Sequence, residues 1–294
     1  YLRAAARLLL LPSVVATCSL LAVDPQDTGP MVRGTVRDEP TGRPISRAIV
    51  SVRDAADGAS AQETNTDDAG KFSLRVVKRG RYSIEARKPG YVTGYPTGAN
   101  GLTLDLRAGG STDDLLLSLT KGAIVVGAVV HPSGETPPGR VFALRRRSWQ
   151  ESSPFGIVAA AELDEQGRYR LFGLPPGIYR LAVAPPSYPP GQDPLPPMYY
   201  PGVQTQNDAK TIILRPGDEI RLSDFPWLAP SSLHRIRGTV RGASVEGGGT
   251  VVSIYTQDFP LPFASIKTAP NGTFAFDSIP PGSYEMGASA PIAG

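Results

Sequence analysis

Cysteine, histidine and net charge are all scarce in this chain of 294 residues. It has one cysteine, Cys18, two histidines and a formal net charge of +3. A single cysteine excludes a disulfide framework and a cysteine-based zinc site. The near-neutral charge balance offers no electrostatic case for nucleic-acid binding.

The residues that could act in catalysis or bind a metal do not have the spacing that known catalytic or metal-binding motifs require. His131 and His234 lie far apart in the sequence, and neither an HExxH spacing nor a Gly-x-Ser-x-Gly sequence accompanies them. The acidic pairs Asp67-Asp68, Asp113-Asp114 and Asp218-Glu219 could be read as calcium ligands or catalytic carboxylates, but each lies in or beside a polar turn. Turn chemistry is the better account. We therefore predict a protein that is not an enzyme and holds no metal or cofactor.

Long hydrophobic runs are confined to the N-terminal segment. Arg3 and Arg7 precede the apolar run of residues 8–23, which Pro12 interrupts, and this is the layout of a secretory signal peptide over residues 1–30. The run is short for a membrane span, so we expect no membrane-spanning segment. Cys18 is either an apolar residue of this peptide or the anchor of a lipoprotein. The location expected is secreted or cell envelope, periplasmic or cell surface.

Glycine and proline, in contrast, are abundant, with 32 and 30 residues. Part of the glycine belongs to a signature that occurs three times: a glycine, an aromatic residue two positions on, a second glycine ten positions after the first, and a tyrosine two positions later. The three copies are Gly70, Phe72, Gly80, Tyr82; Gly167, Tyr169, Gly177, Tyr179; and Gly272, Phe274, Gly282, Tyr284. Such spacing predicts a repeated structural module.

The residues around the signature predict β-strands. Each copy has an apolar opening headed by glycine, at residues 34–36, 127–129 and 238–240. Polar and apolar residues alternate after both signature glycines, as expected for strands with one buried face. The first glycine follows turn-forming residues and predicts a hairpin turn, whereas the second predicts a chain reversal. Many short strands and no helical stretch after residue 30 predict an all-β sandwich fold.

The pattern resembles the carboxypeptidase regulatory-like domain, a transthyretin-like seven-stranded β-sandwich that occurs in tandem in exported bacterial proteins. The resemblance is carried by Gly34-Thr35-Val36, Gly42-Arg43-Pro44-Ile45, the stretch Thr66 to Phe72, and Gly80-Arg81-Tyr82 through Gly90-Tyr91. It implies tandem immunoglobulin- or transthyretin-like sandwiches. No His-x-x-Glu zinc motif is present, so the peptidase activity that this family accompanies is not carried over.

The repeat also predicts the domain boundaries. We expect a first sandwich over residues 31–120, a second over 121–230, and an incomplete third over 231–294. The first closes with strands at residues 102–106 and 115–119, and the second with strands at 211–214 and 219–222. The third lacks both closing strands, which would leave an unpaired sheet edge and suggests that the sequence is a fragment.

One proline-rich segment, residues 185–202, is the candidate ligand site. It contains Tyr188, Tyr199 and Tyr200, and rigid exposed tyrosines suit stacking on sugar rings or capturing a peptide. The alternative is that these rings pack over a sheet edge or between modules.

Three hypotheses for function follow from the sequence. The first is a non-catalytic module that binds a polysaccharide or another cell-envelope component. The second is a structural spacer or adhesion stalk, and the third is an accessory array of a larger enzyme or transporter. In each case we expect a monomeric array of modules.

Overall fold

The structure is a computed structural model that describes residues 29–55, 61–76, 78–93, 102–106, 112–131, 134, 139–146, 155–185, 197–227, 232–241, 249–256, 259 and 261–289. These residues form strands and turns and no helix. The fold is therefore all-β, as predicted. The predicted signal peptide, Cys18 and Tyr188 lie outside the described residues.

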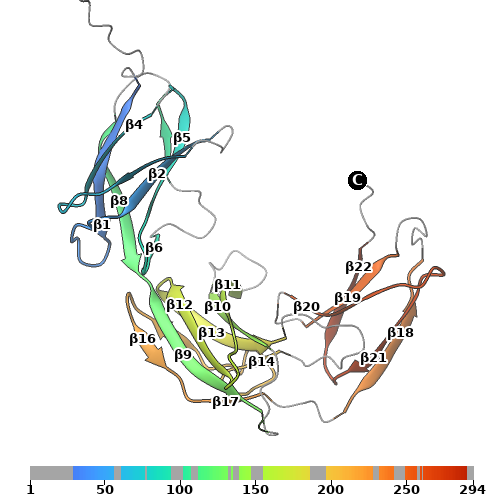
Figure 1. Cartoon of the computed structure of the whole chain (residues 1–294). Coiled ribbons are helices and arrows are strands. Elements are labelled where there is room, and N and C mark those ends of the chain that lie inside the picture. Colours follow the sequence, from blue (N-terminus) through green and yellow to red (C-terminus); the bar gives the residue numbers. More distant parts are fainter. Residues whose placement is uncertain are drawn as a thin grey trace, which may run out of the picture.

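The first sandwich consists of two four-stranded sheets (Figure 1). One sheet has the order β4-β1-β8-β6 and the other β3-β2-β5-β7. The strands are β1 (Met31–Asp38), β2 (Ile49–Asp54), β3 (Ala61–Asn65), β4 (Lys71–Arg75), β5 (Arg81–Arg87), β6 (Tyr91–Thr93), β7 (Leu102–Asp105) and β8 (Thr112–Lys121).

The second sandwich repeats this plan. Its sheets have the orders β12-β9-β16, with β17 also pairing β9, and β11-β10-β13-β14, with β15 also pairing β13. The strands are β9 (Ala123–Val130), β10 (Arg140–Arg146), β11 (Phe155–Glu162), β12 (Arg168–Leu174), β13 (Gly177–Ala184), β14 (Met198–Tyr199), β15 (Ile212–Leu214), β16 (Glu219–Arg221) and β17 (Phe225–Pro226).

The third sandwich has fewer strands among the described residues. Strand β18 pairs β21 in one sheet, and the other has the order β20-β19-β22. The strands are β18 (His234–Thr239), β19 (Val251–Thr256), β20 (Pro262–Lys267), β21 (Thr273–Ile279) and β22 (Tyr284–Ser289). Strands β1 and β9 each have a second neighbour, β8 and β16, on the side away from β4 and β12. Within the described residues, β18 pairs with β21 and has no such second neighbour.

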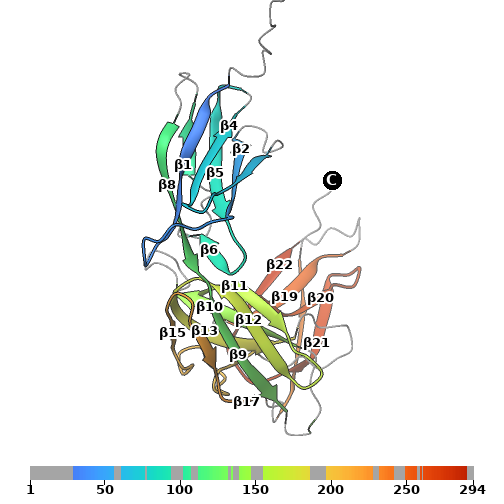
Figure 2. The ribbon, with the colours of Figure 1, turned by 60° about the vertical axis from the view of Figure 1, so that its left-hand side comes forward.

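The predicted closing strands exist and join their own sandwiches. Strands β7 and β15 pair antiparallel with β5 and β13. Strands β8 and β16 pair in parallel with β1 and β9, and Figure 2 shows β8 beside β1. The domain boundaries at residues 30, 120 and 230 themselves stay predictions.

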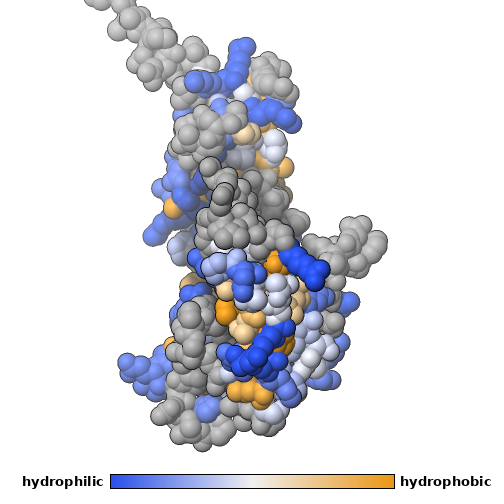
Figure 3. All heavy atoms as spheres, turned by 90° about the vertical axis from the view of Figure 1, so that its right-hand side faces the viewer, coloured by the Kyte–Doolittle hydropathy of each residue, from blue (hydrophilic) through white to orange (hydrophobic). Residues whose placement is uncertain are grey.

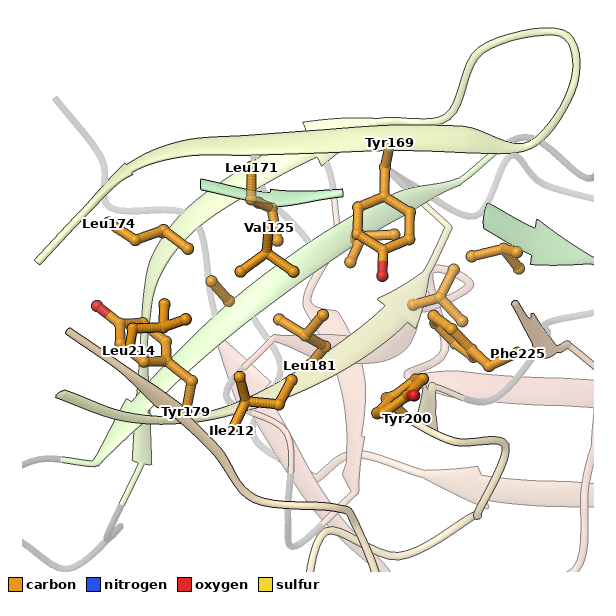
Figure 4. Packing of buried hydrophobic residues seen from close by; sticks show 14 of the residues in the cluster. Val125, Tyr169, Leu171, Leu174, Tyr179, Leu181, Tyr200, Ile212, Leu214 and Phe225 are labelled. Carbon is orange, nitrogen blue, oxygen red and sulfur yellow. The ribbon is translucent and has the colours of Figure 1, made fainter. Parts of the chain in front are cut away.

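Each sandwich has its own hydrophobic core because the alternation buries one face of most strands. Burial in β4 and at the start of β12 alternates strictly, with Phe72, Leu74, Tyr169 and Leu171 inside. The second core is drawn in Figure 4, where Leu181 of β13 lies below Val125 and Leu171 of the facing sheet, with Ile212 of β15 on one side and Phe225 on the other. Alternation of this kind is the period-2 signal from which the strands were predicted.

The first signature glycine forms the same hairpin turn in all three sandwiches. Gly70, Gly167 and Gly272 have φ values of +71°, +72° and +78°. In each turn the glycine N–H donates to the carbonyl of the residue three positions earlier, at 2.8 to 2.9 Å. Residues with a side chain are strained at positive φ, so the backbone of this turn requires glycine at the position, as predicted.

The opening glycine and the first signature aromatic residue are cross-strand partners. The pairs are Gly34 with Phe72, Gly127 with Tyr169, and Gly238 with Phe274. A Cβ atom added to the glycine would lie within 2.6 to 2.8 Å of the aromatic side chain in each pair. The glycine thus leaves room for the ring to cross its strand, a link that the separate sequence motifs did not reveal.

The tyrosine after the second glycine forms the same hydrogen bond three times. The hydroxyls of Tyr82, Tyr179 and Tyr284 donate to the carbonyl of the residue four positions earlier, at 2.8, 2.5 and 2.9 Å. This is a tyrosine corner, in which the hydroxyl ties a strand start to the preceding bend. Tyr82 and Tyr179 are buried, and Tyr284 is half-buried.

Candidate functional site

In the described part of the proline-rich segment, residues 197–200 are buried and include a short strand. Met198 and Tyr199 form β14, which pairs antiparallel with β13. Tyr199 is 1% exposed and Tyr200 is 3% exposed. The prediction that these two rings are exposed for stacking on a ligand is therefore wrong. Ligand binding at Tyr188 stays a prediction, because Tyr188 lies outside the described residues.

The two neighbouring tyrosines are buried on opposite faces of one sheet. Tyr200 faces the second core, where its ring makes an edge-to-face contact with Phe225 at 5.6 Å, visible in Figure 4. Its hydroxyl also forms a 2.8 Å hydrogen bond with Ser223. Tyr199 belongs to a separate cluster on the other side, together with Phe142 of β10. The structure thus agrees with the alternative in which these rings pack over a sheet edge.

A residue of the third sandwich also belongs to the cluster that contains Tyr199 and Phe142. Phe259 comes before β20 and is buried, and its ring meets Phe142 edge to face at 5.3 Å. Aromatic pairs of this geometry add stability beyond the area that they bury. Phe259 therefore joins the third sandwich to the outer face of the second.

The acidic pairs act in turns and surface ion pairs. Asp67 accepts hydrogen bonds from the backbone N–H groups of Ala69 and Lys71, and Asp218 accepts one from the N–H of Arg215. Asp113 forms an exposed ion pair with Arg33 of the adjacent strand β1, and Glu219 forms one with Arg170 of β12, on the other side of β9. Among the described residues, no group of three or more histidine, cysteine or acidic side chains could hold a metal ion.

Among the described residues, one strongly exposed aromatic side chain was not identified from the sequence. Phe172 of β12 is 73% exposed. It follows buried Tyr169 and Leu171, so the alternation places it outward, and this signal was available in the sequence. On the face drawn in Figure 3, hydrophobic patches are interrupted by hydrophilic residues.

The first and second sandwiches meet without a linker. Strand β8 ends at Lys121 and β9 begins at Ala123, so Gly122 alone separates them. The Gly122 N–H donates to the carbonyl of Gly90 at 3.0 Å, and a Cβ added there would lie 2.8 Å from the Cα of Gly173. The Gly217 N–H donates to the carbonyl of Lys121 at 3.0 Å. Backbone from both sandwiches is therefore packed at this junction.

A cleft of about 360 Å³ lies beside this junction. We call it the junction cleft. The first sandwich provides most of its lining, and Pro216, from the turn before β16, provides the rest. Its lining includes Asp38, Arg43, Lys88, Tyr91 and Lys121.

The fold defines a class of protein built from successive β-sandwiches. Residues 31–112 match the carboxypeptidase regulatory-like domain family. The chain therefore contains a domain of this family, and membership of the second and third sandwiches stays a prediction. A comparison with curated proteins finds no match.

Solved structures that resemble the chain do so weakly. The TIE protein of Bacillus anthracis is 17% identical with a TM-score of 0.26, over 90% of this chain and 46% of that one. The chain thus spans less than half the length of that protein. The minor pilin GBS52 of Streptococcus agalactiae is 14% identical with a TM-score of 0.32, over 70% of this chain and 98% of that one. The shaft pilin SpaA of Lactobacillus rhamnosus GG is 12% identical with a TM-score of 0.27, over 70% and 100%.

The described residues also bear on the membrane prediction. They include no helix that is long and apolar enough to cross a membrane.

Proposed function

We propose that this protein is a non-catalytic, exported array of β-sandwiches that acts as a stiff spacer or adhesion stalk in the cell envelope or outside the cell. The observation that carries the proposal is the way in which successive sandwiches are joined. One residue, Gly122, separates β8 from β9, and both neighbouring sandwiches hydrogen-bond to the backbone there. A flexible linker would instead leave the sandwiches free to reorient.

The contact of Phe259 with Phe142 supports the same role at the next junction. A spacer must keep a fixed end-to-end distance. Buried contacts between neighbouring sandwiches hold their relative orientation, whereas a mobile hinge would let it vary. The buried positions of Tyr199 and Tyr200 also weaken the case for a ligand site in the proline-rich segment. Replacing either ring with alanine would test folding and not binding, since both side chains are part of hydrophobic clusters.

The stiffness of the first junction can be measured as a distance distribution between two spin labels. Ser73→Cys and Thr211→Cys place labels at exposed positions of the first and second sandwiches, and Cys18→Ser removes the native thiol. We expect a narrow distribution. A Gly-Ser insert of about six residues after Gly122 should broaden it strongly, because such chains behave as flexible coils.

The matched control places the same insert after Gly134, in a turn within the second sandwich. That variant should keep the narrow distribution. If the native protein is already as broad as the variant with the insert after Gly122, the spacer proposal is wrong.

A further inference from the structure

The junction cleft brings three cationic side chains together in one concave place. Arg43, Lys88 and Lys121 line it, and Asp38 is the one acidic residue among its described lining residues. The Asp38 carboxylate accepts a hydrogen bond from the Thr41 hydroxyl at 2.5 Å. Within the part of the chain that the structure describes, neither the Arg43 guanidinium nor the Lys121 ammonium forms an ion pair or a side-chain hydrogen bond. The cleft therefore has an excess of positive charge.

The sheet surfaces follow a different pattern. Several strand arginines there are paired with carboxylates. Arg33 with Asp113 and Arg53 with Glu85 join adjacent strands, and Arg170 with Glu219 joins the two strands on either side of β9. Opposite charges on adjacent strands stabilise a sheet, whereas like charges held together repel. Unpaired cations gathered in one concave place are an arrangement suited to a bound anion.

One of these cations is held in position by neutral groups. The Lys88 ammonium donates a 2.8 Å hydrogen bond to the carbonyl of Ser46 and lies 5.7 Å from the centre of the Tyr91 ring. A lysine ammonium has three donors, so this arrangement leaves donors for a ligand while restricting the side chain. Ordering a group before binding lowers the entropy lost when the ligand binds.

Tyr91 adds an apolar component. Its ring is half-buried against the first core and also lines the cleft. An inorganic anion gains nothing from packing on an aromatic ring, and a neutral sugar forms no ion pair with the three cations. A sugar that carries a carboxylate uses both, since its ring packs on an aromatic side chain and its carboxylate accepts charge-assisted hydrogen bonds.

We propose that the junction cleft binds a uronic acid unit of an acidic polysaccharide. The side chains of Arg43, Lys88 and Lys121 bind its carboxylate, and Tyr91 contacts the sugar ring. The cleft volume lies within the range of small-molecule sites, about 300–1,000 Å³. The proposal goes beyond the spacer role, because a stiff array needs no such site.

The second sandwich contributes to the site through its closing turn. Pro216 lines the cleft, and a Cβ on the neighbouring Gly217 would lie 3.3 Å from Lys121. Binding is therefore expected to depend on the junction. The Gly-Ser insert after Gly122 should weaken binding, whereas the insert after Gly134 should not.

The test is calorimetric titration of the whole protein with trigalacturonate, and with galactotriose as the neutral analogue. We expect binding of trigalacturonate alone. Lys88→Ala combined with Lys121→Ala should weaken it about tenfold or more, because each charge-assisted hydrogen bond contributes more than a neutral one. Tyr91→Leu keeps an apolar side chain against the core and should weaken binding by a smaller factor.

Lys71→Ala is the matched control, because it removes an exposed cation of the same sandwich outside the cleft. It should leave the affinity unchanged, and thermal unfolding of each variant verifies the fold. Absence of trigalacturonate binding, equal binding of galactotriose, or an equal loss in Lys71→Ala would overturn the proposal. Displacement by inorganic phosphate at similar concentration would instead show a general anion site. None of these results changes the spin-label distances, so the two proposals fail separately.

Discussion

At the scale of single residues, two tyrosines of the second sandwich differ in one hydrogen bond. The Tyr179 hydroxyl donates to the carbonyl of Pro175, whereas the Tyr169 hydroxyl is buried without a hydrogen-bond partner among the described residues. The positions matching Tyr169 in the other sandwiches are Phe72 and Phe274, which lack the hydroxyl. The aromatic positions were predictable from the signature, but which hydroxyl has a partner was not.

The same substitution at these two tyrosines should have opposite effects. Tyr179→Phe leaves the Pro175 carbonyl without its partner and should lower the free energy of unfolding by about 1 kcal/mol. Tyr169→Phe removes an unsatisfied buried group and should raise that free energy by a similar amount. Urea unfolding followed by the fluorescence of buried Trp227 measures both. Equal effects of the two variants would contradict this account.

Burial also makes the second sandwich sensitive to alkali. It raises the pKa of Tyr179 to about 12, although the nearby Arg145 charge opposes the shift. The unfolded tyrosine has a pKa of about 10, so the folded state binds the proton more tightly. The contribution of Tyr179 is fully present below pH 10 and is lost between about pH 10 and pH 12. The decline in unfolding free energy over this range should be shallower in Tyr179→Phe, and an unchanged slope would contradict the assignment.

At the scale of elements, the signature hairpins share a turn in which the first residue differs. Asp67 and Asp164 each accept two backbone N–H groups of their turns, whereas the third turn has Ala269 at that position. The hydrogen bond from the Arg168 N–H is the main reason why the pKa of Asp164 is lowered. Asp164 therefore adds stability above its ordinary pKa, about 3.9, which is lost as the pH falls through its lower folded value.

Restoring the aspartate should stabilise the third sandwich. Ala269→Asp supplies an acceptor for the N–H groups of Asn271 and Thr273, and should add about 0.5–1 kcal/mol. Slower hydrogen exchange of the β21 amides would show the gain. In the first sandwich, Asp67→Ala should speed exchange of β4, while the exposed neighbour Asp68→Ala should not. A gain absent from Ala269→Asp would show that Asn271 already satisfies this turn.

At the scale of the whole molecule, contacts between sandwiches decide what is surface. Phe142, Leu144, Ala182 and Tyr199 lie on the outer face of the sheet that contains β10 and β13. In an isolated sandwich this face would be an exposed apolar patch. Phe259 of the third sandwich packs on it, so the two units form a joint cluster.

Removing the Phe259 ring should loosen the second junction without unfolding either sandwich. Burying a phenylalanine is worth about 1.5–3 kcal/mol, and Phe259→Ala should lose this docking free energy. Increased binding of a hydrophobic dye and a broader distance distribution between spin labels on the two sandwiches would follow. Leu261→Ala, at an exposed position nearby, is the control. If Phe259→Ala matches that control, the contact does not hold the junction.

The strands, their buried faces and the turn glycines were predictable from the sequence because they depend on local properties. Alternation follows from the two-residue period of a strand, and the positive φ of Gly70 and its counterparts is a backbone requirement of the turn itself. The resemblance to the carboxypeptidase regulatory-like domain rested on the same local signals. The family match over residues 31–112 confirms it for the first sandwich, and the tandem copies stay a prediction.

The burial of Tyr199 and Tyr200 and the cations of the junction cleft were decided by the tertiary structure alone. Two neighbouring side chains of an extended segment point to opposite faces, so both are buried only where both faces are covered. Here the second core covers one face, and the cluster that includes Phe142 and Phe259 covers the other. Arg43, Lys88 and Lys121 are likewise far apart in the sequence and meet only through the folding of the first sandwich, in which Tyr91 of β6 pairs with Lys121 of β8. Local pattern determines which face of a strand is apolar, whereas distant segments determine whether that face, or a charge beside it, is left exposed to a ligand.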